Sequence, residues 1–330
     1  MGLTIGQTRE WGSITMAVMV EARELTKYYG DFRAIENLTF EVKKGEIIGL
    51  LGPNGAGKTT TMRIITGFMP PSSGRTRISG FYMVDQSLEA RASIGYLPET
   101  VPLYTEMTVE GYLSFMGSIR GMTSKSIRSR IGDVIESCKL GDYQKSIIGK
   151  LSKGFRQRVG IAQAVLHEPK VLILDEPTIG IDPIQVVETR QLIRDLAGNH
   201  TVILSSHILP EVSMLCSRVL IIHQGQIVAE DSPGELADRL QGVERLEVEV
   251  QGPREAVTMA LEKIRGVVSV ACSSNSEDRN VYKIQARRGL DLRPTVSRAV
   301  ISNGWSLLNL QLISMSLEEI FLKLTTEEQI

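Results

Sequence analysis

A glycine-rich segment between an apolar run and a helical pattern constrains the fold of this chain most. The run "EIIGLLG" (46–52) shows no polar alternation, which is typical of a strand covered on both faces of a sheet. "GPNGAGKTT" (52–60) follows it and leads into "TTTMRIITGF", whose apolar spacing is helical. A strand, a glycine-rich loop and a helix in this order predict an α/β sheet with a ligand at the carboxyl ends of its strands.

The loop fits the spacing of a phosphate-binding loop, G-x-x-x-x-G-K-[ST]. Glycines let successive backbone N–H groups close around phosphate oxygens, and the helix dipole adds positive potential. We expect Lys58 to reach the β- and γ-phosphates and the Thr59 hydroxyl to ligate Mg²⁺. The predicted nucleotide-binding residues of the loop are Gly52, Pro53, Asn54, Gly55, Ala56, Gly57, Lys58, Thr59 and Thr60.

Two consecutive acids follow another apolar run, "KVLILDEP" (170–177). Asp175, at the end of the predicted strand, is placed to hold Mg²⁺ directly or through water. Glu176 is placed to polarise an attacking water, the work of a general base. The alternative for each carboxylate is a helix cap or a turn residue, which does not account for the pair behind a phosphate loop.

The rest of the chain reads as two domains and a short extension. Further strands are predicted at 200–207 and 218–225, and helical spacing at 98–168 predicts an inserted helical subdomain. After residue 242 the order becomes β, α, β, β, α, β and a last helix, which predicts a small ferredoxin-like α+β domain. The expected boundaries are 1–17 for a disordered extension, 18–240 for the nucleotide-binding domain and 243–330 for the accessory domain.

Composition limits the choice of partners. The formal net charge of −1 gives the chain no general attraction to nucleic acid. The three cysteines lie far apart without a C-x-x-C pair, so we expect buried thiols in a reducing cytosol. No apolar run approaches the roughly 18–20 residues that span a bilayer.

These motifs, in this order, resemble the ATP-binding cassette (ABC) ATPases, the nucleotide-binding subunits of membrane transporters. The resemblance runs from about Val20 to Leu236. It implies a P-loop NTPase cassette, with a RecA-like mixed sheet, an antiparallel β subdomain and the helical subdomain already predicted. It also implies ATP and Mg²⁺ as cofactors.

The resemblance gives "LSKGFRQRVG" (151–160) a role that composition alone does not. Ser152 and Gly154 match the family positions that contact the γ-phosphate of the ATP held by the other subunit, and Asp182 matches the aspartate at the dimer interface. Lys153 and Phe155 stand where the family usually has Gly and Gln. The alternative for this segment is an ordinary N-capped helix.

Three further positions carry over from the family. Tyr29 matches the aromatic residue that stacks on adenine, and His207 matches the switch histidine that touches the γ-phosphate and orders the attacking water. We therefore group His207 with Glu176 and Lys58 as catalytic residues. Glu99 stands where the family usually has a Mg²⁺-sensing Gln; the alternative is a solvated loop acid. Residues 101–104 then form a candidate docking patch for the membrane partner.

We therefore expect an ATPase that acts as a homodimer on a separate integral membrane permease, at the cytoplasmic face of the membrane. The motifs look like those of two-subunit exporters of the gliding-motility, multidrug and sodium-export types. A soluble cassette ATPase acting on ribosomes or DNA is the alternative, disfavoured by a single phosphate loop and balanced charge. A regulatory module without turnover is disfavoured because Glu176 and His207 are both present.

Overall fold

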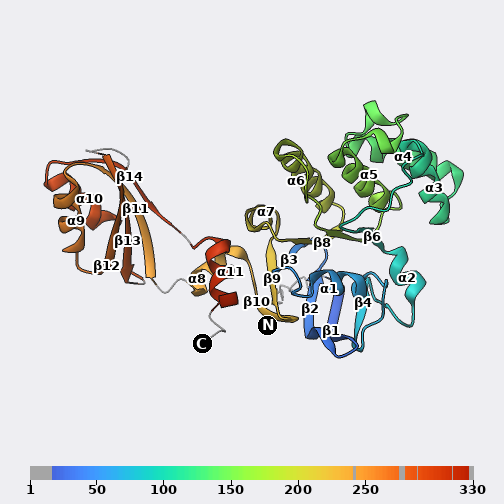
Figure 1. Cartoon of the computed structure of the whole chain (residues 1–330), viewed down its shortest axis with the longest axis horizontal. Coiled ribbons are helices and arrows are strands. Elements are labelled where there is room, and N and C mark those ends of the chain that lie inside the picture. The colour runs from blue at the N-terminus through green and yellow to red at the C-terminus, as the bar shows by residue number, and fades with distance from the viewer. Residues whose placement is uncertain (1–16, 241–242, 275–278, 288, 314, 327–330) are drawn as a thin grey trace, which may run out of the picture. The chain divides into compact units, whose positions relative to one another are not determined.

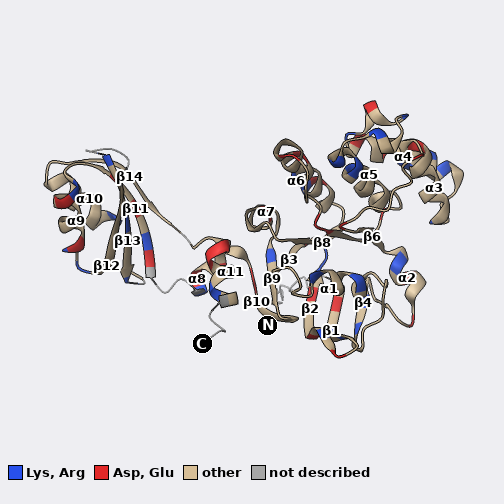
Figure 2. Ribbon diagram, viewed as in Figure 1, with Lys and Arg blue, Asp and Glu red and all other residues tan. Residues whose placement is uncertain are grey.

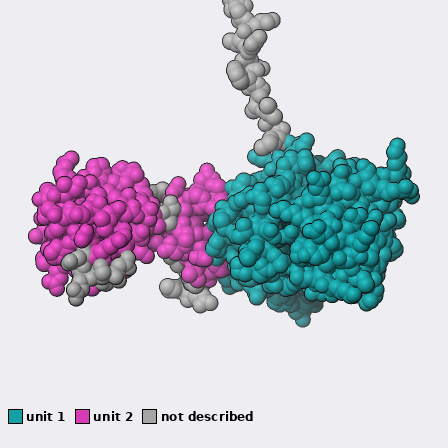
Figure 3. All heavy atoms as spheres, turned by 90° about the horizontal axis from the view of Figure 1, so that it is seen from above, with its two compact units in different colours: residues 1–228 teal, residues 229–330 magenta. Residues whose placement is uncertain are grey.

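The computed structural model describes residues 17–240, 243–274, 279–287, 289–313 and 315–326. They form two compact units, residues 1–228 and 229–330, coloured teal and magenta in Figure 3. The division falls before helix α8 (Pro233–Leu240), which the sequence analysis placed in the first domain, because α8 packs against α11 (Leu317–Thr326) of the second unit. Apart from Ala17, the expected N-terminal extension lies outside the described residues.

A six-stranded sheet is the scaffold of the first unit (Figure 1). Its order is β10-β9-β3-β8-β7-β6, and β3 pairs in parallel with β8 and β9, as β7 does with β8 and β6. All residues of β7 and β8 are buried, as their unbroken apolar runs predicted. The strands are β3 (Ile47–Leu51), β6 (Ile94–Leu97), β7 (Val171–Asp175), β8 (Thr201–Ser206), β9 (Arg218–His223) and β10 (Gln226–Asp231).

A second, antiparallel sheet shares the hydrophobic core of the first unit. Its order is β2-β1-β4-β5, and the tight turn at Gly30 joins β1 to β2. Its buried side chains pack with those of β3, β7 and helix α1 (Lys58–Ile65) into one cluster. The strands are β1 (Val18–Tyr29), β2 (Phe32–Lys43), β4 (Ser73–Ile78) and β5 (Phe81–Tyr82), and helix α2 spans Ser87–Ala92.

The helical insertion lies between β6 and β7, as predicted (Figure 1). It contains α3 (Val109–Ile119), α4 (Ser124–Ser137) and α5 (Lys153–Val165), with two short 3₁₀ turns at Gly141–Tyr143 and Ile148–Lys150. Thr108, Thr123 and Ser152 cap these three helices with side-chain oxygens. Helices α6 (Pro183–Ala197) and α7 (Leu209–Leu215) follow β7 and β8.

The second unit is a four-stranded antiparallel sheet with helices against its buried face. The sheet order is β12-β13-β11-β14. Burial alternates strictly along β13, so one face packs on α9 and α10 and the other faces water. Its elements are β11 (Val243–Gln251), α9 (Arg254–Glu262), β12 (Val267–Ser274), β13 (Arg279–Arg287), α10 (Arg293–Ser302), β14 (Ser306–Leu312) and α11.

Charges of both signs are interspersed over the elements of each unit (Figure 2). In the described part of the chain, no helix combines the length and the apolar character that crossing a membrane requires. The cysteine prediction was only partly right: the free thiols of Cys138 and Cys216 are buried, whereas Cys272 is half-buried.

Candidate functional site

The carboxyl ends of β3, β7 and β8 bring the predicted site together. Because these strands are parallel neighbours, the phosphate loop, the pair Asp175–Glu176 and His207 all leave the same edge of the sheet. A cavity of about 370 Å³ opens there. It is lined by Tyr29, Phe32, Ala34, Asn54, Gly55, Gly57, Lys58, Thr59, Thr60, Glu99, Glu176, Ile179 and His207.

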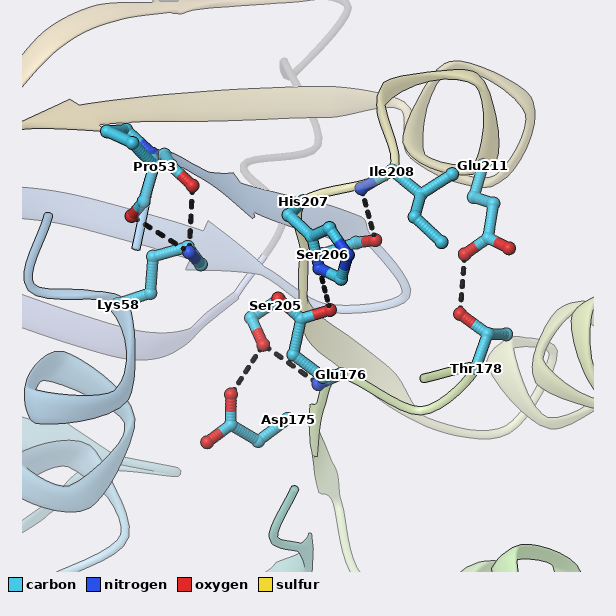
Figure 4. A network of polar contacts seen from close by, with 11 residues as sticks. Pro53, Lys58, Asp175, Glu176, Thr178, Ser205, Ser206, His207, Ile208 and Glu211 are labelled. Atoms are coloured by element: carbon cyan, nitrogen blue, oxygen red, sulfur yellow. Dashed lines mark hydrogen bonds and ion pairs between the residues drawn. The ribbon is translucent and has the colours of Figure 1, made fainter. Parts of the chain in front are cut away.

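The glycine-rich loop wraps around the Lys58 ammonium. Lys58 Nζ donates to the carbonyl oxygens of Gly52 (2.8 Å) and Pro53 (3.2 Å), as Figure 4 shows. These two residues therefore shape the loop behind the lysine, and they do not line the cavity, nor does Ala56. Gly57 has a φ of 110°, a left-handed conformation that favours glycine. A Cβ atom there would also lie 2.6 Å from the Ile35 side chain.

One hydroxyl orders both acids that follow β7. Ser205 Oγ donates to Asp175 Oδ1 at 2.5 Å and accepts from the backbone N–H of Glu176 at 2.9 Å (Figure 4). The β7–β8 register sets Asp175 directly beside Ser205, so the sheet itself aligns this contact. The sequence analysis did not name Ser205; the signal was a hydroxyl residue two places before His207, at the end of a predicted strand.

His207 contacts the other acid. Its Nδ1 lies 2.8 Å from Glu176 Oε2 (Figure 4). A carboxylate only accepts, so Nδ1 donates in this contact, and the His207 side chain also lines the cavity. The Glu176 side chain is 8% exposed and that of His207 46%, so the pair joins a buried carboxyl group to an accessible imidazole.

Burial and charge act in opposite directions at this site. Burial lowers the pKa of Lys58, opposed by the charges of Glu176, Asp175 and Glu99. Burial also raises the pKa of Asp175, and the nearby charges of Glu176 and Glu99 raise it further, while the Ser205 hydrogen bond opposes them. The site therefore brings several carboxylates together, and their negative charges favour the binding of a cation.

Two aromatic side chains line the mouth of the cavity. The β1–β2 turn pairs Tyr29 with Phe32, and both line the cavity, 44% and 66% exposed. The Tyr29 hydroxyl contacts Met69 Sδ at 3.1 Å. The sequence analysis named Tyr29 and missed Phe32, whose signal was its position across a two-residue Gly–Asp turn.

Ser152, Gly154 and Asp182 do not line this cavity. Ser152 caps α5 by accepting from the Phe155 N–H at 3.4 Å, and Asp182 caps α6 by accepting from the Gln185 N–H at 3.0 Å. A Cβ atom at position 154 would lie 1.3 Å from Gln185 Oε1, so any larger residue there would displace the Gln185 side chain. Glu99, in contrast, does line the cavity, together with Thr59 and Glu176.

The site combines a strand-loop-helix and its buried lysine with two acids and a histidine. This combination is typical of P-loop proteins that hydrolyse nucleotides. Comparisons with known proteins name the family. The family model "ABC transporter" matches residues 35–179. The linearmycin resistance ATP-binding protein LnrL of Bacillus subtilis (strain 168) is 34% identical over 308 residues, 93% of this chain and 98% of that protein.

Two more matches agree with this assignment. The bacitracin transport ATP-binding protein BcrA of Bacillus licheniformis is 34% identical over 314 residues, 94% of this chain and 98% of that protein. A solved ATP binding subunit of an ABC transporter matches with a TM-score of 0.62 and 31% identity, over 67% of this chain and 92% of that one. This chain belongs to the ABC transporter ATP-binding proteins, whose ATP hydrolysis is coupled to transport, and the alternative of a non-transport cassette is not favoured.

Proposed function

We propose that this chain works as a homodimer at the cytoplasmic face of a membrane, where its ATP hydrolysis drives export through a separate permease. The catalytic part of this proposal rests on one observation: the Glu176 carboxylate is buried and hydrogen-bonded to His207 beside the Lys58 loop. Two relatives are named for linearmycin resistance and bacitracin transport, which supports export as the direction.

In the proposed reaction each residue has one task. Lys58 and the loop N–H groups hold the phosphates, and Tyr29 stacks on the adenine. Glu176 takes the proton of the attacking water, and His207 holds the Glu176 carboxylate toward the cavity and faces the γ-phosphate with Nε2. Ser205 fixes the backbone from which Glu176 extends.

The oxygen donors of the site fit Mg²⁺. Ser205 donates to only one of the two oxygens of Asp175 in the described contacts, and Thr59, which carries a hydroxyl group, lines the cavity. No three acidic, histidine or cysteine side chains of the described residues are grouped to hold a metal alone, so phosphate oxygens would complete the shell. Bound Mg²⁺ would neutralise phosphate charge. We assign Thr59, Asp175 and Glu99 as the residues nearest to it.

A homodimer would account for the position of Ser152, Gly154 and Asp182 outside the chain's own cavity. We propose that they contact the ATP held by the second subunit. Ser152 stands at the N-terminus of α5, where backbone N–H groups and the helix dipole attract a phosphate. Phe155 packs against Tyr143 in a tilted arrangement with ring centroids 4.1 Å apart, so its side chain contacts the helical insertion.

The membrane partner would dock in a second cavity, of about 630 Å³. Val101, Pro102 and Tyr104 of the predicted patch line it, together with Ile119 and Glu99. Tyr104 is 55% and Ile119 61% exposed, and aromatic and aliphatic side chains open to water often mark a protein interface. Leu103 is half-buried and does not line this cavity, so we remove it from the patch.

The βαββαβ order and the sheet order of the second unit support a ferredoxin-like accessory domain, which we propose extends from residue 243 to 330. Helix α8 packs against α11 of the second unit, so the cassette itself would end near residue 228 rather than at 240. No nucleic-acid partner is proposed.

The test of the catalytic assignment compares two variants. Glu176→Gln should bind ATP, accumulate as a dimer and lose roughly 10²–10⁴ of its turnover, because it cannot accept the proton of water. Lys58→Ala should instead lose nucleotide binding. Phosphate release and equilibrium nucleotide binding separate the two. If Glu176→Gln keeps turnover near the wild-type rate, Glu176 is not the base.

A further inference from the structure

The backbone at Glu176 is held in an unusual conformation. Glu176 is the first residue after β7 and has a φ of 49°, in the left-handed region that a residue with a long side chain seldom occupies. Such a conformation costs free energy and persists only where the surrounding contacts determine it. The contacts on both sides of Glu176 therefore decide where its carboxylate lies.

On the side of the sheet, the Ser205 hydroxyl accepts from the Glu176 N–H. On the other side, the Ile179 N–H donates to the Glu176 carbonyl oxygen at 3.1 Å. Between these two, Thr178 Oγ1 donates to Glu211 Oε2 at 2.5 Å (Figure 4). The turn that carries Glu176 is thus tied to β8 before it and to α7 after it.

The Thr178–Glu211 contact lies in the interior. Thr178 is 3% and Glu211 6% exposed. A buried carboxylate is costly unless hydrogen-bonded, and Thr178 is the hydrogen-bond partner that the described contacts give to the Glu211 side chain. Glu211 lies in the first turn of α7, and His207 stands two residues before that helix, so a short segment of chain links the contact to Thr178 with the histidine that contacts Glu176.

We infer that Thr178 and Glu211 are a positioning pair, which holds the turn after β7 so that the Glu176 carboxylate meets both His207 and the attacking water. Neither residue lines the nucleotide cavity, so neither touches ATP in this arrangement. The inference rests on the proposed role of Glu176 as the base. It makes α7 a mechanical link between that base and His207.

The experiment measures kcat and KM for ATP in the full-length protein. Thr178→Val keeps the shape and removes the donor, and Glu211→Ala removes the acceptor. Each should lower kcat by about tenfold or more, because a displacement of about 1 Å at a reacting group can cost roughly 10²-fold. KM should stay within about twofold, since the phosphate loop is untouched. The double variant should be no worse than the worse single one.

Conservative variants separate positioning from folding. Thr178→Ser and Glu211→Gln keep a donor and an acceptor, and both should retain most of the wild-type kcat. Thr189→Val is the matched control, because Thr189 is equally buried on α6 and its hydroxyl has no hydrogen-bond partner among the described residues. It should leave kcat unchanged, and its melting temperature, measured beside that of Thr178→Val, controls for folding.

The outcomes distinguish this inference from the proposed function. If Glu176→Gln is inactive and Thr178→Val, still folded, keeps its kcat or changes only KM, the positioning role is wrong. If Glu176→Gln itself keeps turnover, the base assignment is wrong and the inference falls with it. A fall of kcat in Thr178→Val and Glu211→Ala, with recovery in Thr178→Ser and Glu211→Gln, supports the pair.

Discussion

At the scale of single residues, Asp175 lies among side chains of both charges, which shift its pKa in opposite directions. The pKa of Asp175 is raised, chiefly by burial and then by the charges of Glu176 and Glu99. Lys58 and the Ser205 hydroxyl oppose that rise without cancelling it. A carboxylate whose folded pKa exceeds its unfolded one favours the fold when protonated and weakens it when charged.

The sign of this effect gives a pH prediction. The contribution of Asp175 to stability is fully present below the ordinary aspartate pKa and is lost as pH rises through the higher pKa of the folded state. Asp175→Asn removes the charge at constant shape, so its melting temperature should gain on that of the wild type as pH rises from about 4 to 7. Thermal melts across this range, without nucleotide, measure the difference.

Mg²⁺ with ATP supplies the control. A bound cation should stabilise the wild type most at the higher pH and Asp175→Asn much less. A difference between the two proteins that stays constant with pH would show that Asp175 does not titrate in this way.

Residues that belong to a sequence motif of fixed spacing were predicted, whereas residues whose role depends on strand pairing were missed. The loop from Gly52 to Thr60 is recognised in the sequence by the positions of its glycines, and Asp175 by its place at the end of an apolar run. Ser205 and Phe32 acquire their roles only from strand register, beside Asp175 and opposite Tyr29. The sequence marks both positions, Ser205 by its place before His207 and Phe32 by the Gly–Asp turn, but the contacts they make are seen only once the strands are paired.

At the level of elements, the helical insertion and the sheet meet around the 630 Å³ cavity. Strand β6 forms one wall, and Tyr104 packs edge-on against Phe115 of α3 at 5.5 Å between ring centroids. Val101 was expected to be free for docking. It is half-buried, and a Cβ on Gly160 of α5 would lie 2.8 Å from its side chain, so the residue also serves the packing of α5.

The docking surface can be tested on its exposed side chains alone. Tyr104→Asp with Ile119→Asp should leave the basal ATPase activity of the isolated protein near that of the wild type. The same variant should abolish its cosedimentation with membranes that contain the permease, because charges replace apolar contact area. Val84→Asp, at a side chain 64% exposed and outside both cavities, is the control. Loss of basal turnover in the double variant would place these residues in the core of the cassette instead.

At the level of the whole molecule, each chain holds a phosphate loop and, at the start of α5, a helix N-terminus at Ser152 that does not line the chain's own nucleotide cavity. A symmetric dimer in which each chain completes the other's site accounts for both. Residues 1–228 and 229–330 each form a compact unit, and the solved relative matches 67% of the chain. We therefore make the prediction of a shared site for the first unit, the cassette.

Two inactive variants should therefore complement each other. Lys58→Ala lacks its own phosphate grip, and Ser152→Arg blocks the site of its partner. Random pairing makes half of the dimers mixed, each with one intact site, so an equimolar mixture should recover about a quarter of the wild-type ATPase activity. Phosphate release from the mixture and from each variant alone measures this. Activity no higher than the average of the two variants would exclude a shared site.

The left-handed turn at Glu176 also bears on how this protein can evolve. Glycine or asparagine would relax the backbone there, so a selection for heat resistance that ignores turnover would favour replacing Glu176. A search for thermostable variants would be expected to select substitutions at 176 early and to lose ATPase activity with them. The residue that we propose as the catalytic base is therefore one that selection for stability alone would replace.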